Sequence, residues 1–68
     1  MLLGDELRRA RLKAKLTQEE LAFKADVSRN YISLLELGEK SPTVSLLMRL
    51  CKALGVKAST LIARIERD

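Results

Sequence analysis

The sequence has no histidine and a single cysteine, so several kinds of site are excluded from the start. One cysteine cannot form a disulfide within the chain, and one thiol without a histidine cannot supply the ligands of a tetrahedral zinc site. We therefore expect no metal, no cofactor and a reducing compartment, the cytoplasm. Cys51 lies in an apolar helical pattern with Leu50 and Leu54, where its expected role is that of a small buried hydrophobic side chain.

Aromatic residues make up only 3% of the chain, and long uncharged runs are missing as well. Stretches such as Asn30–Leu35 and Ser41–Met48 are far shorter than the ~18 apolar residues that a membrane-spanning helix needs. The N-terminal residues also lack a basic segment followed by a long apolar core, so we expect neither a secretory signal nor a membrane span. With so few rings, the core must be built from Leu, Ile and Val packed between helices.

The patterns that carry catalysis are absent too. The sequence contains no histidine base, no carboxylate cluster with partners and no glycine-rich phosphate loop, so we expect a protein that is not an enzyme. The net charge of +4 permits nucleic acid as a partner without requiring it. Basic residues crowd the first quarter of the chain, but a run of this kind is usually a solvated helix face.

What the sequence does contain is helical spacing of apolar residues in five short stretches. They predict helices at about residues 3–14, 17–25, 28–37, 44–54 and 60–66. Residues that favour helix N-caps stand at the start of the last four, either as the first residue or just before it: Thr17 (in a capping box with Glu20), Ser28, Thr43 and Ser59. Gly38 and Gly55 stand where left-handed C-cap residues belong. The predicted fold is all-α, one compact five-helix domain over residues 1–68, with no strand.

Two of these helices, 17–25 and 28–37, are too short to be stable alone and are joined by only two residues. A connection this short makes the helices cross steeply, as in a helix-turn-helix unit. In that unit the first helix lies across the phosphate backbone and the second enters the major groove with its N-terminus first. The second helix here starts with Ser28, Arg29 and Asn30, and Arg and Asn side chains bind guanine and adenine by paired hydrogen bonds.

Five segments together resemble the helix-turn-helix domain of the Xre/Cro/repressor-type family. They are LTQEELA (16–22), VSRNYIS (27–33), ELG (36–38), SPT (41–43) and LCKALGV (50–56). The likeness covers about residues 3–61 and is greatest to small restriction–modification controller proteins and short phage or plasmid repressors. It implies a lambda repressor-like fold and a prokaryotic or phage transcriptional regulator, cytoplasmic and nucleoid-associated, that binds double-stranded DNA in a sequence-specific manner.

The resemblance also implies roles for single residues. Base contacts are implied at the solvent-facing positions of the recognition helix: Arg29, Asn30, Ser33 and Leu34. Phosphate contacts are implied at the helix ends and in the following loop: Gln18, Ser28, Tyr31, Lys40, Ser41 and Thr43. A semi-buried ion pair between Arg11 and Glu36, structural in role, is implied as well.

Several of these positions have a second interpretation. Arg29 and Asn30 could be ordinary helix surface, and Tyr31 could serve core packing alone. Leu34 stands where relatives often carry a polar residue; it either touches a thymine methyl or makes no contact. Asp26 occupies a turn position often held by glycine, and aspartate tolerates a left-handed backbone better than most residues.

The last two predicted helices carry more apolar residues than one core face needs. Exposed apolar patches usually mark an interface, so we predict a homodimer formed through residues 43–66. The expected interface residues are Leu47, Cys51, Leu61, Ile62 and Ile65. Two recognition helices would then lie about 34 Å apart on a roughly palindromic operator. The alternative is a monomer with a generous core.

A function from a different class is an antitoxin-like or adaptor module that uses the same fold to bind proteins. A recognition helix that began with few hydrogen-bonding groups would favour this hypothesis, and Arg29 with Asn30 argues against it. Because 68 residues leave no room for a second domain, we expect regulation through concentration and dimerisation, and no small-molecule effector.

Overall fold

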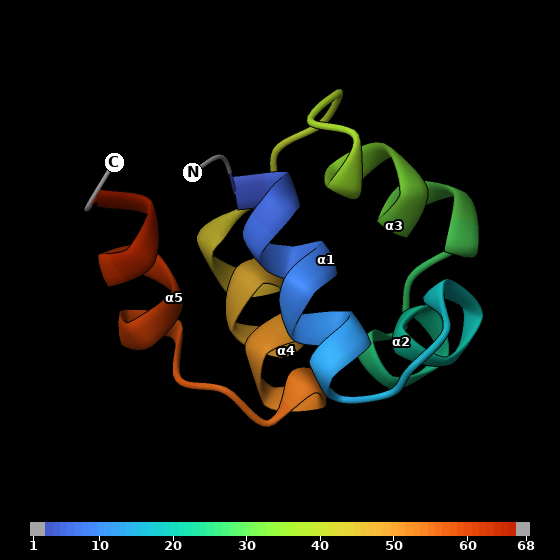
Figure 1. The fold of residues 1–68 in the computed structure, drawn as a ribbon. Helices are drawn as coiled ribbons and strands as arrows, with labels where there is room; N and C mark the ends of the chain where they lie inside the picture. Colours follow the sequence, from blue (N-terminus) through green and yellow to red (C-terminus); the bar gives the residue numbers. More distant parts are fainter. Residues whose placement is uncertain (1–2, 67–68) are drawn as a thin grey trace.

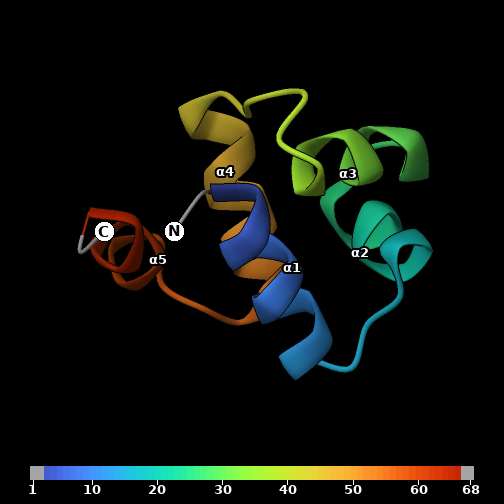
Figure 2. The ribbon, with the colours of Figure 1, turned by 45° about the horizontal axis from the view of Figure 1, so that its top comes forward.

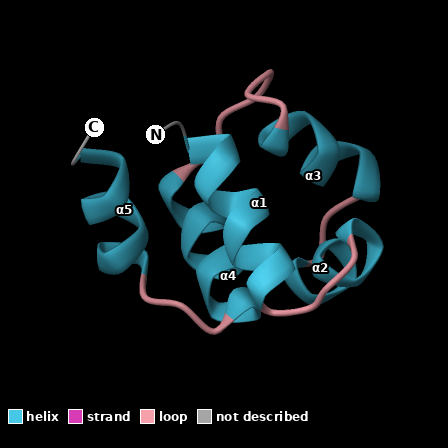
Figure 3. Cartoon of the chain, viewed as in Figure 1, coloured by secondary structure: helices cyan, strands magenta, loops and turns pink. Residues whose placement is uncertain are grey.

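The protein, described here over residues 3–66 of a computed structural model, consists of five α-helices (Figure 1). They are α1 Leu3–Lys13, α2 Gln18–Ala25, α3 Arg29–Glu36, α4 Val44–Leu54 and α5 Ala58–Glu66. Between residues 3 and 66 the chain forms helices and loops without any strand (Figure 3), which confirms the all-α prediction. Within the same range, no helix has the length and apolarity needed to cross a membrane.

The five helices surround one core, to which each contributes. α1 and α4 lie between α2 and α3 at one end and α5 at the other (Figures 1 and 2). α2 packs on α3 and α4, and α1 packs on α3 and α5. The largest fully buried apolar side chains come from all five helices: Leu7, Leu21, Ile32, Leu35, Leu50 and Leu61.

Local signals for the starts of α2, α3 and α4 are confirmed. In the capping box, the Glu20 amide donates to Thr17 Oγ1 at 3.0 Å and the Thr17 amide donates to Glu20 Oε1 at 2.8 Å. The bond from the Thr17 amide holds the pKa of the Glu20 carboxyl below its ordinary value. Ser28 and Thr43 each accept the backbone N–H three residues further on, at 3.1 Å.

Two helix ends differ from the prediction. α1 ends at Lys13 because Lys15 adopts a left-handed conformation (φ 59°), and the Leu16 amide closes the end by donating to the Arg11 carbonyl at 3.1 Å. Lysine rarely marks such an end, so the sequence carried no signal for it. α5 begins at Ala58, so Ser59 lies inside the helix and is not its N-cap. The first intrahelical bonds of α5 are accepted by the Lys57 carbonyl.

Gly4 brings α1 unusually close to α3. A Cβ atom built at Gly4 would lie 2.5 Å from the Leu35 carbonyl oxygen and 2.7 Å from the Glu36 carbonyl oxygen. Those are backbone atoms at the end of α3, which cannot move aside as a flexible side chain can. Glycine at this position therefore fixes the distance between α1 and the last turn of α3.

Candidate DNA interface

The turn between α2 and α3 sets how the two helices cross. Asp26 closes α2 in the left-handed region (φ 59°, ψ 49°), as its place in the sequence predicted. The Val27 amide donates to the Ala22 carbonyl at 2.9 Å, and the Asp26 amide donates to the same turn of α2. These bonds form a compact helix C-cap, so only three residues, Asp26, Val27 and Ser28, separate the end of α2 from the start of α3.

The start of α3 is open to solvent, whereas its inner face is buried. Ile32 and Leu35 are at most 2% exposed, which anchors α3 on the core. Of the predicted base-contacting residues, Arg29 and Asn30 are exposed, while Ser33 and Leu34 are half-buried. The two side chains best suited to reading bases therefore lie at the solvent-facing N-terminal end of a fixed helix.

Most of the predicted phosphate-contacting residues lie either in the segment that follows α3 or at the N-terminal end of α3. Lys40, Ser41 and Thr43 are exposed in the segment that follows α3. Tyr31 is half-buried on α3, and Lys40 Nζ lies 6.0 Å from the centroid of its ring, at the outer limit of a cation–π interaction. This contact brings the loop cation next to the recognition helix. Ser28 is exposed and accepts the N-cap bond, so its hydroxyl hydrogen remains available as a donor.

The predicted partners Arg11 and Glu36 lie together and tie α1 to α3. Arg11 Nε donates to Glu36 Oε2 at 2.7 Å and Nη2 donates to Oε1 at 3.1 Å, a paired geometry. The side chains are only 10% and 4% exposed. Arg11 Nη1 also donates to the Leu16 carbonyl at 2.8 Å. Gln18 is drawn into this network, because its Nε2 donates to Glu36 Oε1 at 3.2 Å. Gln18 thus has a contact within the chain that the sequence did not suggest.

The predicted dimer residues are placed very differently from one another. Cys51 and Leu61 are each 2% exposed in the core of the single chain, which corrects their assignment to an interface, since a partner could not reach them. Burial also raises the pKa of the Cys51 thiol. Leu47 and Ile65 are half-buried and Ile62 is exposed. Two residues of α4 outside the predicted set are more exposed still, Val44 at 76% and Met48 at 59%.

Several large apolar side chains of α4 and α5 are exposed or only half-buried, and we call them the α4–α5 apolar face. They are Val44, Leu47, Met48, Ile62 and Ile65. The apolar spacing predicted that α4 and α5 carry more apolar residues than one core face needs. Spacing alone could not tell which side of each helix would face the core.

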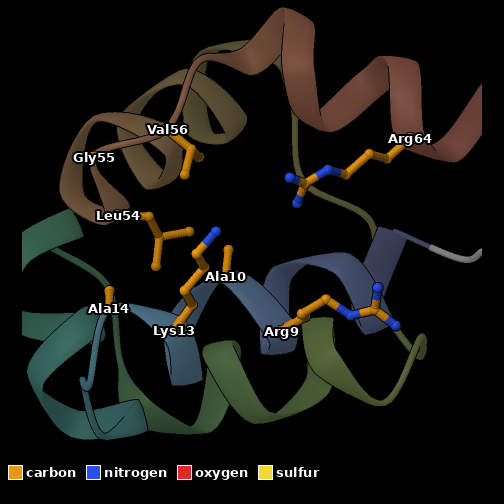
Figure 4. Close-up of a pocket in the computed structure, with 8 residues that line it drawn as sticks. All are labelled: Arg9, Ala10, Lys13, Ala14, Leu54, Gly55, Val56 and Arg64. Carbon is orange, nitrogen blue, oxygen red and sulfur yellow. The ribbon is translucent and has the colours of Figure 1, made fainter.

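A basic pocket separates α1 from the end of α4 and α5 (Figure 4). Its lining combines the apolar side chains of Ala10, Ala14, Leu54 and Val56 with three cations, Arg9, Lys13 and Arg64. Glu6 lies close to two of these cations: its carboxylate oxygens are 3.9 Å from Arg9 Nη1 and 3.8 Å from Arg64 Nη1. The Glu6 side chain is fully buried, and neither oxygen has a hydrogen-bond partner among residues 3–66.

Comparison with known proteins gives a consistent result. Residues 7–61 match the helix-turn-helix family. Control protein C.BamHI of Bacillus amyloliquefaciens is 38% identical over 63 residues, 91% of this chain and 78% of that protein. The restriction-modification controller protein C.AhdI from Aeromonas hydrophila superposes with a TM-score of 0.84 at 30% identity, covering 87% of this chain and 86% of that one.

The P22 c2 repressor, solved in complex with a synthetic operator, superposes with a TM-score of 0.83 at 34% identity. The alignment covers 90% of this chain and 92% of that one. The resemblance seen in the sequence is thereby confirmed: the chain belongs to the Xre-type helix-turn-helix family.

Proposed function

We propose that the protein is a transcriptional regulator that binds a specific operator in double-stranded DNA through the N-terminal end of α3. The observation that carries this proposal is the exposure of Arg29 and Asn30 at the start of a helix whose other face is locked into the core. An α-helix fits the major groove, where paired hydrogen bonds from Arg to guanine and from Asn to adenine distinguish bases.

Contacts with the backbone would set the register of α3 on the duplex. Lys40 beside Tyr31 is suited to bind a phosphate, and Ser41 and Thr43 follow in the same exposed segment. Ser28 and Gln18 lie at the N-terminal ends of α3 and α2, where backbone amides favour anions. Each neutralised phosphate releases counterions, so affinity should fall as salt rises.

Binding selection tests this proposal. The wild-type protein is used to enrich duplexes from a random library, and its affinity for the enriched duplex is compared with that for a shuffled sequence. The Arg29→Ala/Asn30→Ala variant should lose about 1–3 kcal/mol per lost base contact on the enriched duplex only. Lys57→Ala removes an exposed cation from the α4–α5 connection and serves as the control. Equal binding of enriched and shuffled duplexes by the wild type would rule the proposal out.

The protein is further proposed to act as a homodimer through the α4–α5 apolar face. Val44 and Met48 expose large apolar side chains on one helix, and Ile62 does so on the helix packed beside it. A two-fold dimer would place two recognition helices on one face of DNA, about 34 Å apart, and predicts a roughly palindromic operator.

Sedimentation measures this directly. The wild type should sediment at twice the mass of one chain, whereas Met48→Asp should sediment as a monomer. Phe23→Asp is the matched control, since Phe23 is an exposed apolar residue on α2, away from the proposed interface. A wild type that stays monomeric at high micromolar concentration contradicts the proposed dimer, and it leaves the proposal that α3 binds DNA unaffected.

The setting proposed for this activity is the cytoplasm, on the nucleoid. The similarity to controller proteins makes control of a restriction–modification system one candidate role, and the similarity to phage repressors makes control of phage genes another. A methyltransferase and an endonuclease gene beside this one would support the first of these roles, and phage or toxin genes would support a different one.

A further inference from the structure

The turn of the helix-turn-helix unit is held in a conformation that its central residue does not favour. Asp26 has φ 59° and ψ 49°, and a left-handed backbone costs a residue with a side chain free energy that glycine does not lose. The C-cap bonds use the Ala22 and Phe23 carbonyls, whereas the Ala25 and Asp26 carbonyls accept no backbone hydrogen bond among residues 3–66. The turn therefore needs support from outside its own segment.

Arg49 of α4 supplies that support. Its Nη2 donates to the Ala25 carbonyl at 2.6 Å and lies 3.2 Å from the Asp26 carbonyl oxygen, so one guanidinium nitrogen contacts the last residue of α2 and the turn residue. A cation here also interacts favourably with the negative end of the α2 dipole. Arg49 and Ala25 are 24 positions apart in the sequence, and the pattern of residues around Arg49 does not predict the contact.

We propose that Arg49 is a positioning residue for DNA recognition: by holding Ala25 and Asp26, it keeps the turn left-handed and fixes the angle at which α3 leaves α2. The effect on DNA rests on the function proposed above, whereas the effect on the turn does not. Since Arg29 and Asn30 lie three and four residues after Asp26, a change in this angle displaces both side chains while leaving the rest of the surface in place.

Three variants separate this role from simple loss of charge or of stability. Arg49→Gln removes the cation and shortens the side chain. Asp26→Gly places glycine, which adopts the left-handed conformation without strain, at the turn, so it should rescue Arg49→Gln. Lys52→Gln is the matched control, because Lys52 is an exposed cation one turn further along α4 near the same part of α2.

Hydrogen exchange of the free protein tests the turn without DNA. The Val27 amide bonds to the Ala22 carbonyl and reports on the turn, and the amide of buried Leu50 reports on the core. In Arg49→Gln, the Val27 amide should exchange about tenfold faster relative to the Leu50 amide. The added Asp26→Gly change should reverse most of this increase, and Lys52→Gln should cause none.

The ratio of affinities for the enriched and shuffled duplexes tests the effect on DNA recognition. Arg49→Gln should lower this ratio about tenfold, and Asp26→Gly should restore it to within about twofold. Lys52→Gln should leave the ratio unchanged, since loss of a general electrostatic attraction weakens binding to both duplexes equally.

Each outcome decides one part of the inference. If the Val27 amide is unaffected by Arg49→Gln, Arg49 does not hold the turn and the inference is wrong. If Val27 exchange rises but the ratio stays constant, the positioning of α3 by Arg49 is wrong. A wild type with no preference between the duplexes refutes the proposed function instead, and the exchange result still decides whether Arg49 supports the turn.

Discussion

The two ends of the molecule are stabilised in different ways. At the α1–α3 end, a buried ion pair, a bond from Gln18 and the close approach at Gly4 fix three helices against one another within a single chain. At the other end, α5 contributes one fully buried residue, Leu61, and leaves Ile62 42% exposed. The end proposed to read DNA is complete in one chain, whereas the end proposed to dimerise has apolar surface still to bury.

The largest expected effect comes from removing Arg11. Arg11→Met leaves the Glu36 carboxylate buried without its cation, which should lower the free energy of unfolding by about 3–5 kcal/mol. Urea denaturation measures the change, and Arg8→Met, at an exposed position of the same helix, should stay within about 0.5 kcal/mol of the wild type. Adding Glu36→Leu should recover much of the loss, and a small effect of Arg11→Met alone would contradict the view that this pair holds α1 to α3.

A smaller loss is expected at Gly4. Gly4→Ala forces a methyl group against backbone oxygens of α3, and overpacking of this kind costs about 1–3 kcal/mol. Gly55→Ala is the control: its φ of 74° is unfavourable for alanine, but no atom lies within 4 Å of the added Cβ, so about 1 kcal/mol is expected. Thermal unfolding of both variants would show whether the close approach or the backbone conformation matters more.

The α4–α5 apolar face should affect assembly more than the folding of one chain. Ile62→Ser should change the unfolding free energy measured at low protein concentration by less than about 1 kcal/mol, because Ile62 is already partly exposed. The wild-type midpoint of thermal unfolding should rise with protein concentration, and this rise should disappear in Ile62→Ser. If the wild-type midpoint does not depend on protein concentration, the α4–α5 end does not dimerise, and the contrast drawn between the two ends of the molecule is wrong.

The smallest effect concerns Cys51. Its thiol is buried and its pKa is raised, so at neutral pH it is protonated and reacts slowly with alkylating reagents. The labelling rate should equal that of a model thiol only in denaturant, and oxidation should yield no disulfide-linked dimer. Rapid labelling of the folded protein would show that the inner face of α4 opens more readily than its burial indicates.

Features encoded by neighbouring residues were predictable from the sequence. The capping box at Thr17, the N-caps at Ser28 and Thr43 and the left-handed glycines all depend on atoms a few residues apart. The family pattern added the exposed start of α3 and the pairing of Arg11 with Glu36, which spacing along one helix could not provide.

What the sequence did not reveal depends on packing between distant segments. Leu61 belongs to the core because α5 turns that side inward, a choice that helical spacing leaves open. The same holds for buried Glu6 and for Arg49, whose bonds reach a turn more than twenty residues earlier in the chain. The left-handed residue that follows α1 is Lys15 and not a glycine, so the sequence carried no signal for the end of that helix either. Cys51 is buried, as its apolar helical pattern predicted, and this burial is what overturns the interface contact also predicted for it.

Glu6 links the packing of one side chain to the lifetime of the protein. The Glu6 carboxylate is buried without hydrogen bonds within residues 3–66, and the exposed Arg9 and Arg64 side chains, 3.9 and 3.8 Å away, offset only part of the free energy that its burial costs. In a domain of 68 residues, whose stability margin is small, the remaining cost is significant. A less stable protein is unfolded more often and is degraded faster in the cell. If the protein acts through its own concentration, as the sequence led us to expect, faster turnover would let its level follow changes in synthesis more closely, and the packing of Glu6 would then influence how quickly the regulated genes respond.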